Sequence, residues 1–438
     1  MKPIITAESL DWSRREVLRR GGACAVGAIA APYIVPATAL GRGGAVAPSD
    51  KVRMGCIGVG GMGTGNMRAF LNDERVRVVA VCDVDRDHRE RARGICGLAP
   101  GDAYLDFRDV IGRADVDAVM IATPDHWHAV ITSAAARAGK DIYCEKPLSL
   151  TLEEGQRVRA LVKRYHRVFQ LGTWRRSRPA CRFACELVRN GYIGRLRRVM
   201  VGVPEGFAVR GGPFKDGPQS PPERLDYEMW LGPAPWAPYS PGRVHFNFRW
   251  IMDYSSGYIT DWGAHYMDVA HWGLGVDGSG PVRIKGEAGF PKDGLYDAPE
   301  RFRIEYTYRS GAQAIMYSTS DRSQWGMRFE GVEGWVKAEN QTMQAQPAAL
   351  SKVVLGDDEI ALYRSHDHHR NFIDNVYSRG PTAADIDIAF GSTAACHLGT
   401  IAVLLGQELA WDPQAERFAG HEVANRMMSR AMRGAWRV

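Results

Sequence analysis

The feature that most restricts the fold of this chain is a glycine motif at the end of a short apolar run. Residues 52–59 have the composition of a buried strand. Gly58, Gly60 and Gly63 then give the spacing GxGxxG. In such a motif the first glycine permits a tight turn, the second lets a pyrophosphate approach the backbone, and the third lets the next helix pack closely. A helical pattern follows from Met67, and a helix N-terminus offers free N–H groups to phosphates. The segment therefore predicts a dinucleotide-binding βαβ unit.

A second strand-like run ends at Asp83, twenty residues after Gly63. A carboxylate at that position accepts hydrogen bonds from both hydroxyls of an adenosine ribose and repels a 2′-phosphate. We therefore expect NAD rather than NADP, a preference that Arg86 and His88 just downstream moderate. The alternative is that Asp83 is only a turn residue after a strand.

Two further apolar runs repeat the alternation of strand and helix. Residues 116–124 precede an Ala-rich helical pattern, and a run that begins at Asp141 leads into Glu145-Lys146-Pro147. This alternation predicts a doubly wound parallel sheet, a Rossmann domain over residues 51–172. Ligands of such sheets bind at the carboxyl ends of the strands. Four residues fall at such ends: Gly58, Asp83, Thr123 and Lys146.

Thr151 and Glu154 form a capping box that opens a helix within the Rossmann domain. Beyond residue 172 the pattern changes, and residues 301–308 alternate apolar and polar side chains with a period of two. We expect residues 173–438 to form an α+β domain with a mainly antiparallel or mixed open sheet. The Pro/Trp-rich stretch 226–242 is predicted to be an ordered loop or lid, because linkers rarely carry so many aromatic residues.

The N-terminus has the pattern of an export signal. Arg14 and Arg15 precede a Gly/Ala-rich apolar run, and Ala37-Thr38-Ala39 offers a small-x-small cleavage site. This resembles a Tat signal peptide over residues 1–39, followed by a linker over residues 40–50. We therefore expect the Tat export machinery as a partner, a periplasmic location, and a cofactor loaded before export. The alternative, a transmembrane anchor, is opposed by prolines in a weakly apolar run.

Charge and cysteine content exclude several other classes. The net charge of +6 is spread among residues of both signs, so we expect no nucleic-acid partner. The eight cysteines are scattered without a CxxC spacing, which argues against a disulfide framework and a structural zinc site.

Several motifs together resemble the Gfo/Idh/MocA oxidoreductase family, which includes glucose–fructose oxidoreductase and inositol dehydrogenase. They are GVGGMG (58–63), ATPDHWH (122–128), EKPLSL (145–150) and TDWGAHYMDVAHW (260–272), and HHRNFIDNV (368–376) is similar to the family's late segment. The resemblance covers nearly the whole chain from Lys51 onward. EKP with a downstream DxxxH is more specific than the glycine motif.

The resemblance implies roles for particular residues. Lys146 lies at the nicotinamide and assists proton transfer at the substrate hydroxyl, while Asp261 and His265 complete the catalytic site. The implied cofactor-binding residues are Gly58, Gly60, Gly61, Met62, Gly63, Asp83, Thr123, Asp125, His128, Glu145 and Lys146. The family more often has Asn where Asp125 stands. The implied substrate residues are Trp174, Arg175 and His368, and a homo-oligomer is expected through the C-terminal sheet.

The chemistry of these side chains suits alcohol oxidation. Asp261 and His265 are four residues apart and would share one face of a helix. A neutral histidine can take the hydroxyl proton as hydride leaves, and a neighbouring carboxylate can orient it. Lys146 can stabilise the developing alkoxide.

A metal site is the alternative. Potential ligands are Asp261, His265, Asp268, His271, His245, His366, His368 and His369. Without HExxH or a cysteine set we expect no catalytic metal.

Two functions remain open at this point. The first is an exported NAD(P)-dependent oxidoreductase that transfers hydride to or from a sugar, polyol or cyclitol hydroxyl. The second is a redox-neutral carbohydrate enzyme that uses tightly bound NAD through a keto-sugar, for glycoside cleavage, epimerisation or sugar–sugar dismutation. A non-catalytic NAD-binding protein would require Lys146, Asp261 and His265 to coincide by chance.

Overall fold

The first sheet is parallel throughout, because its central strands are apolar runs buried on both faces. The strand order is β3-β2-β1-β4-β5-β6, the doubly wound order of a Rossmann fold. This confirms the predicted fold class of the N-terminal half. The strands are β1 Val52–Ile57, β2 Val76–Cys82, β3 Ala103–Tyr104, β4 Ala118–Ile121, β5 Asp141–Cys144 and β6 Phe169–Leu171.

The structure is a computed structural model that describes residues 47, 50–212 and 217–438. The predicted signal peptide 1–39 lies outside the described residues, as does the predicted linker 40–50 except for Ala47 and Asp50. Residues 52–438 form one structural unit.

Short capping signals begin several helices around this sheet. Asp85 accepts hydrogen bonds from two backbone N–H groups at the start of α3, and Asp106 does the same for one N–H group at the start of α4. The capping box predicted for Thr151 and Glu154 is present at α6. The elements are α2 Gly61–Leu71, α3 Arg86–Cys96, η3 Pro100–Asp102, α4 Phe107–Ile111, α5 Asp125–Arg137 and α6 Leu152–Arg164.

The second sheet is mixed and has the order β13-β12-β11-β7-β10-β9-β8-β14-β15. Strands β7 and β10 run parallel, and the other pairs in this sheet are antiparallel. This confirms the predicted α+β half. The strands are β7 Leu196–Pro204, β8 Arg283–Gly289, β9 Arg301–Thr307, β10 Gln313–Thr319, β11 Gly326–Gly331, β12 Trp335–Glu339, β13 Thr342–Gln346, β14 Leu409–Asp412 and β15 Arg417–Phe418.

Helices cover one face of this sheet, since its alternate residues such as Ala314 and Met316 of β10 are fully buried. The remaining helices are α7 Pro179–Arg189, α8 Tyr227–Leu231, α9 Gly263–Leu274, α10 His368–Ser378, α11 Ile386–Leu405 and α12 Glu422–Arg426. Short 3-10 turns are η4 Trp174–Ser177, η5 His245–Trp250, η6 Gly257–Ile259, η7 Arg322–Gln324 and η8 Ala348–Lys352.

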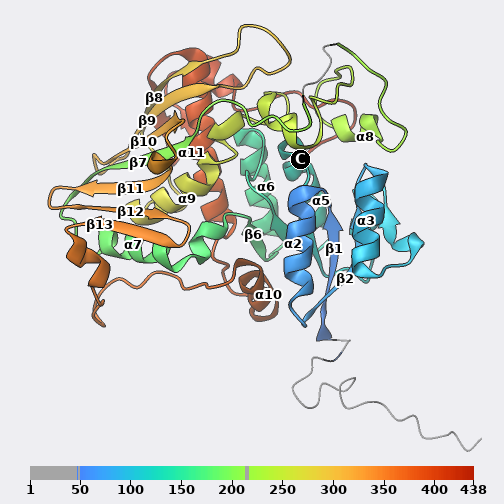
Figure 1. Cartoon of the computed structure of the whole chain (residues 1–438), viewed down its shortest axis with the longest axis horizontal. Helices are drawn as coiled ribbons and strands as arrows, with labels where there is room; N and C mark the ends of the chain where they lie inside the picture. The colour runs from blue at the N-terminus through green and yellow to red at the C-terminus, as the bar shows by residue number, and fades with distance from the viewer. Residues whose placement is uncertain (1–46, 48–49, 213–216) are drawn as a thin grey trace, which may run out of the picture. The chain divides into compact units, whose positions relative to one another are not determined.

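Helix α11 joins the two halves. It packs against α6 beside the Rossmann sheet and against α9 and β8 of the second half (Figure 1). It is apolar and long enough to cross a membrane, but 83% of its apolar stretch is buried inside the protein, as in a core helix. One apolar core therefore extends from Ile57 in β1 to Phe329 in β11. The relative position of the two sheets is thus set by packing.

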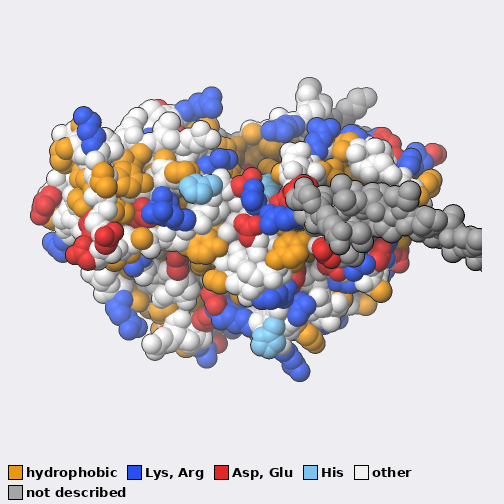
Figure 2. Space-filling model, turned by 90° about the horizontal axis from the view of Figure 1, so that it is seen from below, with side chains coloured by type: hydrophobic (Ala, Val, Ile, Leu, Met, Phe, Trp, Pro, Cys, Tyr) orange, Lys and Arg blue, Asp and Glu red, His pale blue; other side chains and the backbone are white. Residues whose placement is uncertain are grey.

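Helix α10 returns to the Rossmann sheet although it lies late in the sequence. Phe372 of α10 packs against Phe70 of α2, with ring centroids 6.0 Å apart. Figure 2 shows one face of the molecule, where basic and acidic side chains are interspersed rather than gathered by sign.

The contact between α9 and the second sheet gives a stability prediction. A Cβ at Gly273 would lie 2.4 Å from the buried Phe329 ring, so Gly273→Ala should cost about 1–3 kcal/mol despite the better helix propensity of alanine. Gly94→Ala in α3 is the matched control, because nothing lies within 4 Å of its added Cβ; it should stabilise by up to about 1 kcal/mol. Urea midpoints measure both, and an unchanged midpoint for Gly273→Ala would contradict the packing.

Candidate active site

A cavity of about 620 Å³ lies at the carboxyl ends of the Rossmann strands. Its volume is typical of small-molecule and cofactor sites. Ten of the eleven residues predicted to bind the cofactor line it: Gly58, Gly60, Gly61, Met62, Asp83, Thr123, Asp125, His128, Glu145 and Lys146. The eleventh, Gly63, packs underneath, where an added Cβ would lie 1.8 Å from the carbonyl oxygen of Gly58.

The glycine loop fits a dinucleotide phosphate. Gly58 has a positive φ of 77°, and a Cβ there would lie 2.6 Å from the backbone nitrogen of Thr123. Gly60 caps α2 without any side-chain hydrogen bond, so side chains leave the first N–H groups of the helix open. The space beside Gly61 is clear for 4 Å. Free N–H groups at a helix start, with room for a ligand, are what a pyrophosphate requires.

Asp83 has a structural role that the sequence did not reveal. Its two carboxylate oxygens accept hydrogen bonds from the backbone N–H groups of Val59 and Asp85, each at 2.9 Å. The carboxylate therefore braces the glycine loop, and its remaining lone pairs face the cavity that it lines. His88 Nδ1 lies 3.6 Å from Asp83, and this partner raises the pKa of His88.

Lys146 follows β5 and forms a buried ion pair with Asp261, which precedes α9. Arg249 of η5 lies on the same carboxylate, with its Nε 3.3 Å from Oδ1. Burial alone would raise the pKa of Asp261, but the charges of Lys146 and Arg249 hold it at about 2. Asp261 is thus a permanent anion that fixes the position of Lys146.

His265 lies on α9 and is nearly fully buried. Burial, followed by the charges of Arg175 and Lys146, moves its pKa well below the usual value, so its imidazole is neutral. Its Nδ1 has no hydrogen-bond partner among the described residues. The expectation that Asp261 orients His265 is therefore wrong. Helix α9 begins only at Gly263, and Asp261 turns to Lys146 instead.

Asp125 is the first residue of α5 and lines the same cavity as Lys146. Within the described chain its buried Oδ2 has no hydrogen-bond partner. Burial raises its pKa to about 7, against a hydrogen bond from Ser255 and the positive charges of Lys146 and Arg249. This carboxyl therefore changes its protonation near neutral pH.

Glu145 and His128 hold the two loops that surround Lys146. Glu145 accepts hydrogen bonds from Asn66 at 2.9 Å and from the backbone N–H of Lys146 at 3.3 Å. The ring nitrogens of His128 lie 2.6 Å from the carbonyl oxygen of Pro147 and 2.9 Å from that of Thr123. His128 thus connects the loop after β4 with the loop after β5.

The three predicted substrate residues fall into two groups. The Trp174 ring lies 5.8 Å from the His265 ring, and the Arg175 guanidinium lies 4.5 Å from the Trp174 centroid. Arg175 is buried, and its Nε and Nη1 have no partners in the described part of the chain. His368 instead uses both ring nitrogens on Ser177 Oγ (2.9 Å) and the carbonyl oxygen of Leu171 (2.8 Å).

The segment 222–250 contributes several cavity residues that the sequence patterns did not identify: Leu225, Met229, Trp230, His245, Phe246, Phe248 and Arg249. It is attached to the Rossmann half at two places. Leu225 forms a β-bridge with Asp85, and the carbonyl oxygen of Trp230 in α8 lies 3.0 Å from nitrogen atoms of His126 and Trp127 in α5. The only sequence signal was the high aromatic content of residues 226–242.

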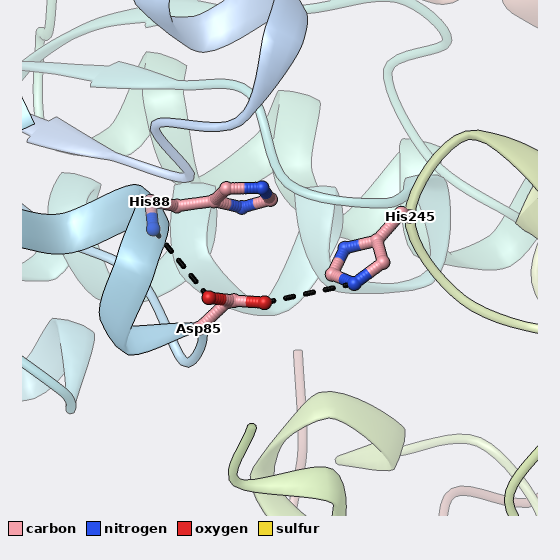
Figure 3. A group of neighbouring side chains, drawn as sticks. All are labelled: Asp85, His88 and His245. Carbon is pink, nitrogen blue, oxygen red and sulfur yellow. Dashed lines mark hydrogen bonds and ion pairs between the residues drawn. The ribbon is translucent and has the colours of Figure 1, made fainter. Parts of the chain in front are cut away.

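Asp85, His88 and His245 form a cluster at the boundary between this segment and α3 (Figure 3). Their potential ligand atoms lie within 4.8 Å of one another, and His245 Nε2 lies 3.6 Å from Asp85 Oδ2. Asp85 already has a cationic partner, because Arg224 Nε lies 3.2 Å from its Oδ2. We therefore interpret the cluster as a polar contact between the segment and the Rossmann half.

Two other potential ligands from the sequence have protein partners. Asp268 binds Arg176 at 2.9 Å, and His271 Nε2 lies 2.8 Å from the Tyr308 hydroxyl.

Comparison with known proteins finds similar sequences and similar solved structures. The chain is 38% identical over 133 residues to inositol 2-dehydrogenase 1 of Saccharopolyspora erythraea, covering 30% of this chain and 39% of that one. It is 34% identical over 160 residues to a glycosyl hydrolase family 109 protein of a Shewanella species, covering 32% and 35%. It thus spans less than half of the length of these relatives. The crystal structure of aldose-aldose oxidoreductase from Caulobacter crescentus has the same fold, with a TM-score of 0.62, 19% identity and coverage of 82% and 99%.

Family models match nearly the whole described chain. Residues 52–173 match the oxidoreductase family's NAD-binding Rossmann fold, and residues 181–438 match the same family's C-terminal alpha/beta domain. Together with the glycine loop and the cavity at the strand ends, these matches show that the chain belongs to the Gfo/Idh/MocA oxidoreductase family.

Proposed function

We propose that this protein is an NAD-dependent oxidoreductase that transfers hydride between the cofactor and a hydroxyl of a sugar, polyol or cyclitol. The observation that carries the proposal is the buried pairing of Lys146 with Asp261 at the wall of the cofactor cavity, with His265 on the adjoining helix. Residues from both halves of the chain meet there. A relative named inositol 2-dehydrogenase supports the substrate class.

Each side chain has a separate task in this proposal. The Lys146 ammonium donates a hydrogen bond to the substrate oxygen and stabilises negative charge as the O–H bond breaks. Asp261, which also binds Arg249, holds that ammonium in place. His265, neutral and with a buried Nδ1 that has no partner among the described residues, accepts the hydroxyl proton. The cofactor, when bound, supplies the acceptor for the hydride.

The substrate would lie beside Trp174 and Arg175, which adjoin His265. An aromatic ring offers an apolar surface to the C–H face of a sugar, and Arg175 offers unpartnered N–H donors. His368 supports this wall through Ser177 rather than by an open ring nitrogen.

A tightly held cofactor is part of the proposal. The segment 222–250 lines the cavity and is bonded to α5 and to the start of α3, so it encloses a ligand between two halves of the chain. Figure 1 shows α8 of this segment near α3 and α5. The carboxylate of Asp83 favours NAD over NADP.

The second candidate is redox-neutral sugar chemistry with a retained cofactor. The contacts between segment 222–250 and the Rossmann half favour it, because a cofactor that they retain must be reoxidised in place. The names of two similar proteins, a glycosyl hydrolase family 109 protein and an aldose-aldose oxidoreductase, support the same idea.

Export by the Tat route to the periplasm remains part of the proposal on the strength of Arg14, Arg15 and the Ala37–Ala39 site. We also propose a homo-oligomer through the face of the second sheet opposite the helices. That face presents half-buried side chains such as Tyr317 and Trp335 among charged ones.

One experiment separates the two functions. The purified protein is assayed for bound NAD and then mixed with candidate sugars and inositols, with and without added NAD. A dehydrogenase accumulates ketone and reduced cofactor in proportion to added NAD. A redox-neutral enzyme converts excess sugar with no external acceptor. No change in cofactor absorbance and no conversion of any sugar would reject both.

Removal of the predicted acid–base groups should be severe. His265→Ala should lower turnover by about two to four decades, the usual contribution of a general base, and Lys146→Met comparably. The double variant should lose much less than the product of the two single losses, because the residues act together. His366→Ala, an exposed histidine, is the control. Steady-state kinetics measure this, and near-normal turnover of His265→Ala would remove His265 from the mechanism.

Replacement of Asp83 should change cofactor choice. Asp83→Ser removes the charge that repels a 2′-phosphate, so the ratio of the Kd for NADP to that for NAD should fall. Asp87→Ser, two residues beyond Asp85 and largely exposed, should leave the ratio unchanged. Equilibrium binding of both dinucleotides measures the ratio. Equal wild-type affinities for NAD and NADP would show that the Asp83 assignment is incorrect.

Loss of the ion pair between Arg224 and Asp85 should loosen cofactor retention. Such a partly exposed pair contributes about 0.2–1 kcal/mol, so Arg224→Ala should speed NAD release by up to about fivefold. Arg198→Ala removes a comparable pair on the second sheet and is the matched control. Release into excess unlabelled cofactor is followed with time. Identical release rates for both variants and the wild type would contradict a role for the segment in retention.

A further inference from the structure

We propose that Asp125 stores the proton of the substrate hydroxyl while the hydride is held on the cofactor. The inference rests on the proposed function. It names the group that binds the hydroxyl proton after the site of Lys146, Asp261 and His265 has removed it from the substrate.

The location of Asp125 is the first support. It opens α5 immediately after the loop that follows β4, and it lines the cofactor cavity together with Lys146 and Arg249. Asp125 is 5% exposed, and its buried Oδ2 has no partner among the described residues. A buried carboxylate oxygen without a partner is costly when charged, and protonation relieves that cost.

The other charged and titratable groups around Asp125 are not expected to store the proton. Asp261 is held ionised by Lys146 and Arg249, with a pKa of about 2. The ring of His265 is kept neutral by burial and by neighbouring positive charges, so it passes a proton on but does not hold one. Arg249 is paired with Asp261.

Two further groups adjoin Asp125. The buried Cys144 of β5 stays a thiol, because burial raises its pKa. His128, on the same helix as Asp125, has both ring nitrogens engaged with backbone carbonyl oxygens, and burial lowers its pKa. Asp125 lines the cavity and burial raises its pKa to about 7, so its protonation changes near neutral pH.

The charge of the cofactor determines the direction of the proton transfer. Oxidised nicotinamide is a cation and reduced nicotinamide is neutral. A cation in the shared cavity favours the ionised form of Asp125, and loss of that charge favours the protonated form. Reduction of the bound cofactor should therefore be coupled to uptake of one proton by Asp125.

The step balances in atoms and charge. The substrate C–H bond breaks and its electron pair forms a C–H bond on the nicotinamide ring. The O–H bond breaks and the carbon–oxygen double bond forms. The hydroxyl proton leaves to His265 and ends on the Asp125 carboxylate. In a redox-neutral cycle the reverse transfer returns both hydride and proton to the sugar.

The test is the pH dependence of the midpoint potential of the bound cofactor, measured in the holoenzyme against a small-molecule redox couple. Reduction of the ring alone takes up one proton for two electrons, a tenfold change in the equilibrium constant per pH unit, or about 30 mV. If Asp125 takes up a second proton, the slope should approach twice that value. The pH window runs from the pKa of Asp125 in the oxidised holoenzyme to its higher pKa in the reduced holoenzyme. This window should include pH 7.

Asp125→Asn keeps the size and one acceptor oxygen of the side chain but exchanges no proton, so its slope should return to one proton throughout. Asp385→Asn is the matched control. Asp385 is a buried N-cap of α11 whose pKa is also raised by burial, it does not line the cavity, and asparagine caps equally well. Its slope should be that of the wild type.

A one-proton slope in the wild type from about pH 6 to pH 8 would overturn the proposal, and so would a two-proton slope that persists in Asp125→Asn. If Asp125→Asn loses its cofactor, Asp125→Ser, which also exchanges no proton in this range, takes its place. The measurement needs no sugar. A two-proton slope in an enzyme that oxidises no sugar would therefore support proton storage and reject only the proposed function.

Discussion

The buried ion pair between Lys146 and Asp261 is the interaction on which the rest of the site depends. Lys146 belongs to the end of β5 in the Rossmann sheet, and Asp261 precedes α9 in the second half. Removing one member of a buried pair leaves an uncompensated charge at a cost of about 3–5 kcal/mol. The pair therefore ties the start of α9 to the end of β5, with His265 one turn further along that helix.

The apolar core makes such precision possible. Helix α11 packs at once against α6, α9 and β8, so the helices that surround the site are fixed by a common neighbour. On α9, Gly273 lets the helix approach the Phe329 ring more closely than any other residue would. Close packing over this length means that the charged pair does not have to hold the two halves together. The core positions Lys146 and Asp261, and the ion pair then forms between them.

The parts of this design that were predictable from sequence are the local ones. The glycine motif from Gly58 to Gly63 and the capping box at Thr151 are set by neighbouring residues, and both are present. The partner of Asp261 was not predictable, because the four-residue spacing to His265 assumes a helix that includes both, whereas α9 starts at Gly263. Arg249 was missed for a related reason: its segment has no periodicity, and its contact with Asp261 exists only in the folded chain.

The two ends of the cavity show how charge is balanced in the folded chain. At the Asp83 end, Asp83 faces His88, and Asp85 faces Arg224. At the Lys146 end, Lys146 and Arg249 share the carboxylate of Asp261, while Asp125 and Glu145 also line the cavity. A cationic ligand at that end would favour the ionised form of the buried Asp125 carboxyl. The charge of Asp125 and the charge of the ligand are therefore coupled.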